Sequence, residues 1–305
     1  MSLLIRRSTL ILPVNVPRFV EKAYLRGADA IMLDMEDAVP LKEKDAARRL
    51  IRDSLPAVAR GGAEVFVRVN NDTAMLALDL DASVHVGLDG ICFPKAESPE
   101  QLVRLDGELS RLEQDRGISP GRIEVAALIE SPRGVVHLDA IAAASPRVRT
   151  ITLVPEDYWL EIGVEPSADG LELLYALSKI VTVCKAAHIA PMGLLGSIAD
   201  FRDLHAFERA AARARDVGCV GASCIHPDQV AILNRVFSPA PERVAAARKA
   251  AEAFEEGLRR GTASVNVDGA MVDTPVYERA RRILEHAAAI AASEKRRAEA
   301  LARSR

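Results

Sequence analysis

The sequence predicts a (β/α)8 barrel followed by a C-terminal extension. Eight short apolar runs recur between residues 9 and 225, amphipathic segments separate them, and several of the runs are apolar almost throughout. Strands that are apolar on both faces are typical of a parallel sheet covered by helices, and the intervening segments are long enough for parallel crossovers. A doubly wound sheet is the alternative. Because no GxGxxG follows the first run and no Walker A lysine loop is present, its nucleotide-binding form is disfavoured.

The predicted elements alternate in chain order. The eight strands are Thr9–Val14, Ala30–Met35, Glu64–Val69, Gly90–Pro94, Ile123–Ile129, Arg149–Val154, Ala190–Leu194 and Gly221–Ile225. Helices are predicted at Pro17–Leu25, which begins with proline, and at Lys44–Val58, which has apolar residues near helical spacing. A third helix, at Leu171–Ala187, has four apolar residues on one face: Leu173, Leu177, Ile180 and Cys184.

The composition is that of a folded, near-neutral protein. Of 305 residues, 49% are apolar and 27% are charged, and 40 basic side chains stand against 43 acidic ones, for a net charge of −3. These values exclude a disordered or collagen-like chain, and they give no electrostatic reason to expect nucleic acid or an anionic membrane as a partner. The length suits one barrel or two smaller domains.

The cysteines and the hydropathy indicate a cytoplasmic protein. The four cysteines form no CxxC pair and lie in apolar surroundings, so we expect buried free thiols in a reducing compartment. They are Cys92, Cys184, Cys219 and Cys224. No uncharged apolar run is long enough to span a membrane, and the N-terminal charges follow a very short apolar stretch, the reverse of a signal peptide.

The pattern changes after Phe237, so we expect a barrel domain over residues 1–237 and a helical extension over 238–305. Pro239 and Pro241 open a helix that runs to about Gly261. Thr262–Val267 and Ala270–Val272 then resemble a hairpin around an Asp-Gly turn. Pro275 starts a last helix that we expect to fray, as a solvated end, over the basic segment Glu294–Arg305.

Polar residues of functional type follow six of the predicted strands. They are Asp34, Glu36 and Asp37 after the second strand, Arg68 and Asn70 after the third, Lys95 and Glu97 after the fourth, Glu130 after the fifth, Glu156 and Asp157 after the sixth, and His226 after the eighth. Because barrel enzymes gather their reacting groups at the carboxyl ends of the strands, this arrangement predicts an active site there.

Glu130 and Asp157 are the candidate metal ligands. A carboxylate that directly follows the apolar run ending at Ile129 needs a cation or hydrogen-bond donors. Two carboxylates with open positions for substrate suit Mg²⁺, and the lack of a His/Cys ligand set argues against zinc. A structural salt bridge from Glu130 to an arginine is the alternative.

Arg68 offers a planar fork for a substrate carboxylate. Alternatively, it could pair with the acidic group Asp34, Glu36 and Asp37 on the neighbouring strand, or do both. We expect those three residues to orient Arg68 and the metal's water molecules rather than to bind the metal. His226 could act as a base, but a lone histidine at a strand end is more often a structural donor. The Gly193–Ser197 segment is a weak phosphate-binding signal.

Eight segments along the chain form a recognisable set: Arg6–Pro13, Asp34–Val39 with Lys44 and Arg48, Val67–Asn70, Pro94–Glu97, Ala127–Gly134, Pro155–Asp157, Ile225–Val230 and Val267–Pro275. Together, and in this order, they resemble the citrate lyase β-subunit group of the HpcH/HpaI aldolase family. Each is weak alone, but the set is specific and spans nearly the whole chain.

The resemblance implies a Mg²⁺-dependent barrel enzyme that cleaves or forms a carbon–carbon bond in a β-hydroxyacyl-CoA thioester such as citryl-, citramalyl- or malyl-CoA. In such relatives the residues matching Glu130 and Asp157 bind the metal, and the arginine matching Arg68 holds the oxo-acid carboxylate. The aspartate matching Asp273 acts as the acid/base group from the C-terminal lid of a neighbouring subunit. A homotrimer, or a hexamer made of two trimers, is implied.

Three alternatives remain open from the sequence. The first is a pyruvate-type metal-dependent aldolase, although the Asp-Gly-Ala-Met-Val-Asp segment at residues 268–273 favours the thioester reaction. The second is a subunit that acts on an acyl carrier protein inside a citrate lyase complex. The third is a non-catalytic CoA-thioester-binding protein, since a fold does not fix a function.

Overall fold

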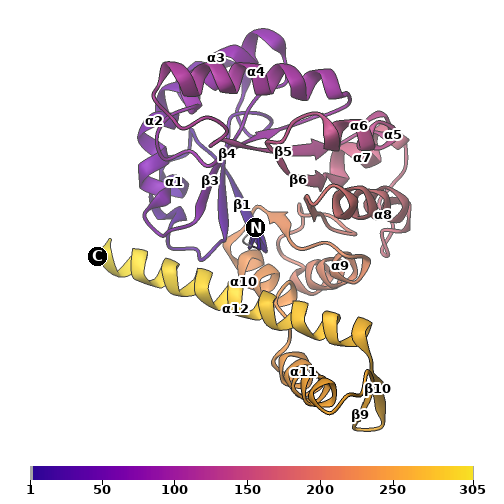
Figure 1. Ribbon diagram of the computed structural model, residues 1–305. Helices are drawn as coiled ribbons and strands as arrows, with labels where there is room; N and C mark the ends of the chain where they lie inside the picture. Colours follow the sequence, from indigo (N-terminus) through magenta and orange to yellow (C-terminus); the bar gives the residue numbers. More distant parts are fainter. Residues whose placement is uncertain (1–2, 305) are drawn as a thin grey trace. The chain divides into compact units, whose positions relative to one another are not determined.

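The computed structural model describes residues 3–304, which form two compact units. The larger unit consists of Arg6–Phe237 with residues 300–304, and the smaller consists of Ser238–Glu299 with residues 3–5. Figure 1 shows that the first unit is a ring of strands surrounded by helices. The (β/α)8 barrel predicted from the sequence is therefore confirmed.

Eight parallel strands form the barrel sheet. They are β1 (Ser8–Pro13), β2 (Ala30–Asp34), β3 (Glu64–Arg68), β4 (Gly90–Phe93), β5 (Glu124–Ile129), β6 (Val148–Leu153), β7 (Ala190–Met192) and β8 (Ala222–Cys224). Neighbours pair in chain order from β1 to β7, and β8 pairs with β1. A parallel bridge between Met192 and Gly221 links β7 to the residue before β8, so the sheet is nearly closed.

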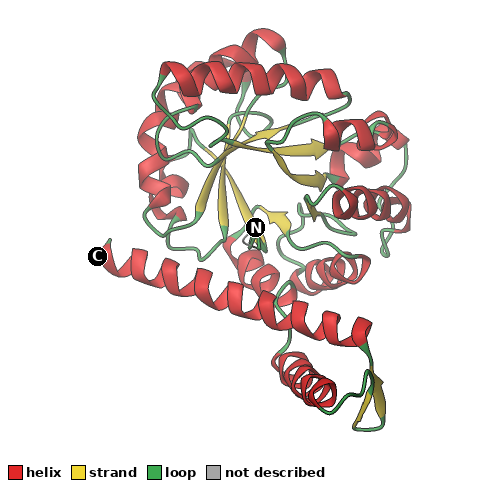
Figure 2. Cartoon of the chain, in the orientation of Figure 1, coloured by secondary structure: helices red, strands yellow, loops and turns green. Residues whose placement is uncertain are grey.

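Helices cover the outer face of this sheet (Figure 2). They are α1 (Pro17–Ala23), α2 (Lys44–Ala59), α3 (Thr73–Ser83), α4 (Pro99–Asp115), α5 (Pro132–Val136), α6 (Leu138–Ala143), α7 (Pro155–Ile162), α8 (Leu171–Ala186), α9 (Leu204–Val217) and α10 (Pro227–Val236), with a short 3-10 turn at Leu41–Glu43 before α2. Within residues 3–304, no helix is both long and apolar enough to cross a bilayer.

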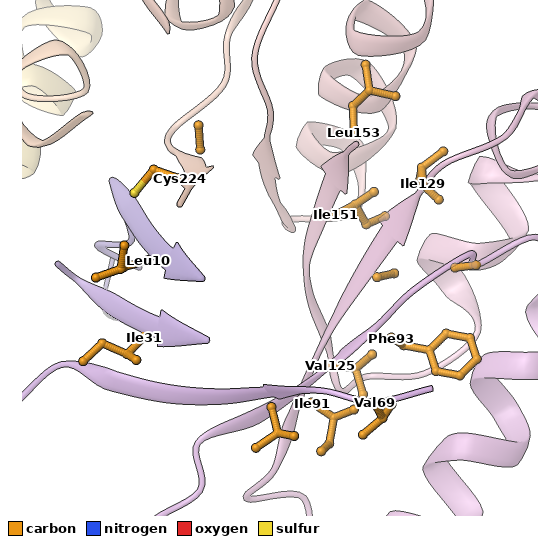
Figure 3. Close-up of a cluster of buried hydrophobic side chains, with 14 of the residues drawn as sticks. Leu10, Ile31, Val69, Ile91, Phe93, Val125, Ile129, Ile151, Leu153 and Cys224 are labelled. Carbon is orange, nitrogen blue, oxygen red and sulfur yellow. The ribbon is translucent and has the colours of Figure 1, made fainter. Parts of the chain in front are cut away.

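Strand alternation separates two sets of buried side chains. Figure 3 shows the larger set, in which Leu10, Ile31, Val125 and Ile151 come from four different strands of the sheet. The set also includes residues of the covering helices, among them the predicted apolar face of α8. Three of the four cysteines belong to it as well. All four cysteines are free and buried, as predicted.

A smaller set of apolar side chains forms a separate cluster on the alternate positions of the strands. Its members are Ala30, Met32, Phe66, Cys92 and Ala126, with Ile11 packed against them. Gly90 makes room for the Phe66 ring, because a Cβ at Gly90 would lie 2.3 Å from Phe66 Cε1. The barrel interior is thus packed at mid-height, and functional side chains are confined to its ends.

Arg6 fills the amino end of the barrel. Its guanidinium donates to Glu64 (2.8 Å), Glu124 (3.0 Å) and Thr150 (2.6 Å), and it lies 4.3 Å from the centre of the Phe66 ring. Because Arg6 is only 3% exposed and has all these partners, this end of the barrel is occupied by structural contacts.

The smaller unit contains α11 (Pro241–Arg259), the strands β9 (Val265–Val267) and β10 (Ala270–Val272), and α12 (Thr274–Arg303) up to Glu299. The strands are antiparallel, and Asp268 (φ +51°) and Gly269 (φ +84°) form the tight turn between them, as predicted. The expectation of a frayed end from Glu294 is wrong, because α12 continues to Arg303. Alanine, glutamate, lysine and arginine, which dominate that segment, are strong helix formers.

Candidate functional site

A cavity of about 620 Å³ opens at the carboxyl ends of the strands, and we call it the mouth cavity. Apolar side chains from β1, β2 and β5 line it, including Ile11, Met32 and Leu128. Five of the polar residues predicted at the strand ends are also part of its wall, namely Asp34, Arg68, Glu156, Asp157 and His226, whereas Glu130 and Glu36 are not. A mostly apolar cavity of this size with a few convergent charged groups is typical of a small-molecule site.

Arg68 is held by Asp34 in a two-bond pair at one side of the mouth cavity. Arg68 Nε donates to Asp34 Oδ1 at 2.8 Å, and Nη2 donates to Asp34 Oδ2 at 2.7 Å. The pair forms because the two residues face each other at the ends of β2 and β3. Although burial opposes it, the hydrogen bonds and charge of Asp34 raise the pKa of Arg68 above its ordinary value. Arg68 therefore stays positive and is fixed in orientation.

Glu36 links Arg68 to Lys95. Its Oε2 lies 3.1 Å from Arg68 Nη1, and its Oε1 accepts a 2.5 Å hydrogen bond from Lys95 Nζ. Burial outweighs these cations and raises the pKa of Glu36 above its ordinary value. Asp37 is more remote, at 3.9 Å from Arg68 and 3.8 Å from Lys95. The acidic residues at the end of β2 thus pair with Arg68, as the structural interpretation of Arg68 predicted, and also with Lys95.

Lys95 adopts a left-handed backbone conformation at the carboxyl end of β4. Its φ is +50°, which is uncommon for a residue with a side chain. The Asn71 side-chain amide donates to the carbonyl oxygens of Pro94 and Lys95, both at 3.0 Å, and holds this turn in place. Strain of this kind costs roughly 1–3 kcal/mol and is concentrated at functional sites. No local sequence pattern predicts a positive φ at a lysine, so the role of Lys95 is visible only in the structure.

Glu130 is a buried carboxylate without a hydrogen-bond donor. It is 2% exposed, and neither of its oxygens has a hydrogen-bond partner within the described chain. The nearest cation is Lys95, whose Nζ lies 4.0 Å from Glu130 Oε2. Burial, followed by the negative charges of Asp157 and Glu36, raises the pKa of Glu130 from 4.5 to about 8. The arginine salt bridge considered as its alternative role is not formed, so this carboxylate fits a cation ligand.

Glu156 and Asp157 are neighbours in the sequence, but Glu156 binds the loop after β7 whereas Asp157 faces the mouth cavity. Both lie in the first turn of α7, directly after β6. Glu156 accepts hydrogen bonds from Ser197 Oγ (2.6 Å) and from the backbone N–H of Ile198 (3.1 Å), so it anchors the loop after β7. Asp157 lines the mouth cavity and acts electrostatically on Glu130. Within residues 3–304, no group of three or more His, Cys, Asp or Glu residues is arranged to hold a metal ion.

The loops after β4 and β5 are joined next to Glu130. Ser131 Oγ donates to Glu97 Oε1 at 2.6 Å, and the N–H of Ala96 donates to the carbonyl of Leu128 at 3.0 Å. Gly134 permits this close approach, because a Cβ there would lie 2.6 Å from the Ala96 oxygen. These contacts fix the backbone that carries Glu130.

His226 and the segment after β7 have structural contacts at the cavity wall. His226 Nδ1 accepts a hydrogen bond from the N–H of Asp228 at 3.3 Å and caps α10, and its ring stacks on Phe201 at 5.1 Å. His226 therefore has the structural role expected for it, but its Nδ1 acts as a hydrogen-bond acceptor and not as a donor. Gly193 lines the mouth cavity, and Ser197 is bound to Glu156.

Asp273 lies in the smaller unit, between β10 and α12. Its Oδ1 accepts from the N–H of Val276 at 3.2 Å, and its carbonyl accepts from the N–H of Tyr277 at 2.9 Å. The side chain is partly exposed. Asp273 therefore caps the first turn of α12, and its second carboxylate oxygen is available for another contact.

The structure brings most of the predicted site residues of the barrel into one cluster. Direct contacts connect Asp34, Glu36, Asp37 and Arg68, and electrostatic interactions connect Glu130 with Asp157 and Glu36. Lys95, one of the polar residues predicted at the strand ends, bridges the two groups. A charged cluster of this kind at the carboxyl ends of the strands is the arrangement of a (β/α)8-barrel enzyme.

Residues 7–227 match the HpcH/HpaI aldolase/citrate lyase family, and the chain belongs to this family. Citrate lyase subunit beta of Leuconostoc mesenteroides subsp. cremoris is 36% identical, covering 92% of this chain and 93% of the relative. L-malyl-CoA/beta-methylmalyl-CoA lyase of Rhodobacter capsulatus is 31% identical, covering 93% and 95%. The structure of protein CitE from Mycobacterium tuberculosis with magnesium, acetoacetate and coenzyme A is 29% identical, with a TM-score of 0.73 and coverage of 92% and 97%. The resemblance stated from the sequence motifs is confirmed.

Proposed function

We propose that this protein is a Mg²⁺-dependent lyase that cleaves or forms a carbon–carbon bond in a β-hydroxyacyl-CoA thioester. The observation that carries the proposal is the buried Glu130 carboxylate, which has no hydrogen-bond donor and lies in the field of Asp157 at the carboxyl end of the barrel. The similar proteins support it, because they include lyases of citrate and of malyl-CoA and a structure with magnesium and coenzyme A.

The donor set at the site fits Mg²⁺. Glu130 and Asp157 offer hard carboxylate oxygens. Since no group of three or more His, Cys, Asp or Glu residues within residues 3–304 is placed to hold a metal ion, coordination positions would remain for water and substrate. When bound, Mg²⁺ would polarise the substrate oxygens next to the bond that breaks. Glu130 and Asp157 would hold this ion at the wall of the mouth cavity.

Arg68 would bind the carboxylate of the 2-oxo acid portion of the substrate. Asp34 and Glu36 fix the guanidinium, so little orientation is lost when the substrate arrives. In cleavage, the bond between the hydroxyl-bearing carbon and the carbon next to the thioester breaks. The hydroxyl releases its proton to water and becomes the oxo group, and the carbon next to the thioester takes a proton from Asp273. Asp273 then regains a proton from water, so no proton is gained or lost overall.

A thioester panel tests this function. Purified protein would be incubated with citryl-, citramalyl- and malyl-CoA, and acyl-CoA and 2-oxo acid products would be measured with Mg²⁺ and with excess EDTA. We expect cleavage of at least one thioester that EDTA abolishes and Mg²⁺ restores. Absence of cleavage of all three, despite Mg²⁺, would contradict the proposal. Cleavage of the acyl-carrier-protein thioester alone would instead indicate a subunit of a citrate lyase complex.

The pKa of Glu130 predicts that the affinity for Mg²⁺ depends on pH. Because this pKa is raised to about 8, the carboxyl is protonated in the metal-free protein below that pH, and Mg²⁺ must displace the proton. We expect the apparent dissociation constant to fall roughly tenfold per pH unit between pH 6 and 8 and to level off above. Calorimetric Mg²⁺ titrations across this range measure it, and a constant affinity would mean that no such proton is displaced.

A further inference from the structure

We propose that Lys44 is a positioning residue that holds the acidic segment after β2 so that Glu36 can orient Arg68. Lys44 is the first residue of α2, and its side chain is buried. Its Nζ donates to the carbonyl oxygens of Met35 (2.7 Å) and Glu36 (2.6 Å) and to Asn70 Oδ1 (2.8 Å). All three donor positions of the ammonium group are thus used by protein oxygens.

Asn70 extends this contact to the end of β3. Its side-chain N–H₂ donates to Met35 O (3.1 Å) and Asp79 Oδ2 (2.6 Å), and its backbone N–H also donates to Asp79 Oδ2 (2.7 Å). Asp79, on α3, in turn accepts from Arg48 Nε of α2 at 2.7 Å. A buried polar network therefore joins the segments that follow β2 and β3 to two helices.

The network holds the backbone of Glu36, whose carboxylate contacts both Arg68 and Lys95. Lys44 binds the carbonyl of Glu36, and the carboxylate of the same residue lies against Arg68 and Lys95. The three donor positions of Lys44 are all used by protein oxygens, and Lys44 is not among the residues that line the mouth cavity. Its effect on the reaction therefore passes through Glu36, which contacts Arg68 directly and acts on Glu130 through its charge.

This inference rests on the proposed function, in which Arg68 binds the 2-oxo acid. The test compares Lys44→Met with Lys179→Met. Lys179 is the matched control because its Nζ also donates to two backbone carbonyls, of Val135 (2.6 Å) and Val136 (3.1 Å), at the end of α5. Steady-state kinetics would be measured in the condensation direction, with acetyl-CoA and pyruvate or glyoxylate, and Mg²⁺ binding would be measured by calorimetry.

We expect Lys44→Met to raise the KM of the 2-oxo acid by about tenfold or more, because a small misplacement of a binding group has large effects. The KM of acetyl-CoA should stay within about twofold of wild type, because the thioester does not depend on Arg68. The Mg²⁺ dissociation constant should change by a smaller factor than the KM of the 2-oxo acid, because Glu36 acts on Glu130 only through its charge. Lys179→Met should leave all three unchanged. Equal effects of the two variants, or a rise of similar size in all three constants of Lys44→Met, would overturn the positioning role.

Asn70→Ala gives a second route if Lys44→Met does not fold, since it removes one acceptor of Lys44 and keeps the two carbonyls. It should shift the same KM in the same direction by a smaller factor. Where Lys44→Met does fold, the effects of the two substitutions should be less than additive in the double variant, as expected within one network. An Asn70→Ala protein with the wild-type KM for the 2-oxo acid would contradict the inference. Failure of the proposed function is distinct, because wild-type protein would then give no condensation at all.

Discussion

Glu130→Gln should lower turnover of the thioester substrate by at least about 100-fold, which corresponds to roughly 3 kcal/mol of lost transition-state stabilisation. Glutamine keeps the shape of the side chain but removes the charge that would hold Mg²⁺. We expect Mg²⁺ to raise the melting temperature of wild type and not that of this variant. Turnover and thermal unfolding, each with and without Mg²⁺, measure the two effects.

The variant should also stabilise the metal-free protein at high pH. Because the pKa of Glu130 is raised from 4.5 to about 8, the folded metal-free protein holds a proton there that the unfolded chain has lost. Its free energy of unfolding therefore falls as the pH rises from about 4.5 to about 8. Glutamine has no such dependence. We expect the melting temperature of metal-free Glu130→Gln to exceed that of wild type by a margin that grows as the pH rises from 6 to about 8 and levels off above that.

Glu124→Gln is the matched control, because Glu124 starts the same strand β5 at the opposite end of the barrel and pairs with Arg6. It should keep both turnover and the Mg²⁺ response. If Glu130→Gln turned over substrate at the wild-type rate, Glu130 would not be a metal ligand and the metal site would have to be elsewhere. If Glu124→Gln lost the Mg²⁺ response to the same extent, the effect would reflect general loss of structure.

The barrel was predictable because its strands are nearly continuous apolar runs. For example, the strand predicted at Ala30–Met35 is β2 at Ala30–Asp34, and the one predicted at Gly90–Pro94 is β4 at Gly90–Phe93. A strand that is covered on both faces is apolar throughout, so its position in the sequence is clear. The predicted bounds then differ from the observed ones only at the ends of the strand. The segment after Glu294 stays helical because its helix propensity outweighs its high charge, and the prediction of a frayed end is wrong for this reason.

The chemistry of the site was predictable from residue type and position, but the contacts were not. A carboxylate at the end of one strand and an arginine at the end of the next imply a pair, and Asp34 and Arg68 form it. By contrast, Lys44 binds mainly backbone carbonyls, which every residue has, so nothing in the sequence marks its partners. The left-handed turn at Lys95 likewise depends on the Asn71 side chain 24 positions away.

Asp273→Asn should abolish turnover while leaving binding of the CoA thioester within about threefold of wild type, because it removes an acid/base group and no binding contact. Asparagine caps helices as well as aspartate does, so the contact from Asp273 to the N–H of Val276 that begins α12 can be kept. A loss of turnover of about 100-fold or more, with intact binding by calorimetry, would separate acid/base chemistry from folding of the smaller unit. Wild-type turnover would mean that Asp273 has only its capping role.

Mixing two inactive variants tests whether Asp273 acts on a neighbouring subunit. If each site combines Glu130 of one chain with Asp273 of another, oligomers formed from equal amounts of Asp273→Asn and Glu130→Gln contain intact sites. Random assembly makes about one site in four intact, so roughly a quarter of the wild-type turnover should return. Mixing Asp273→Asn with the double variant is the control, because neither chain then supplies Asp273. A mixture that exchanges subunits but stays inactive would show that the two residues do not work together across an interface, and each chain would have to complete its own site.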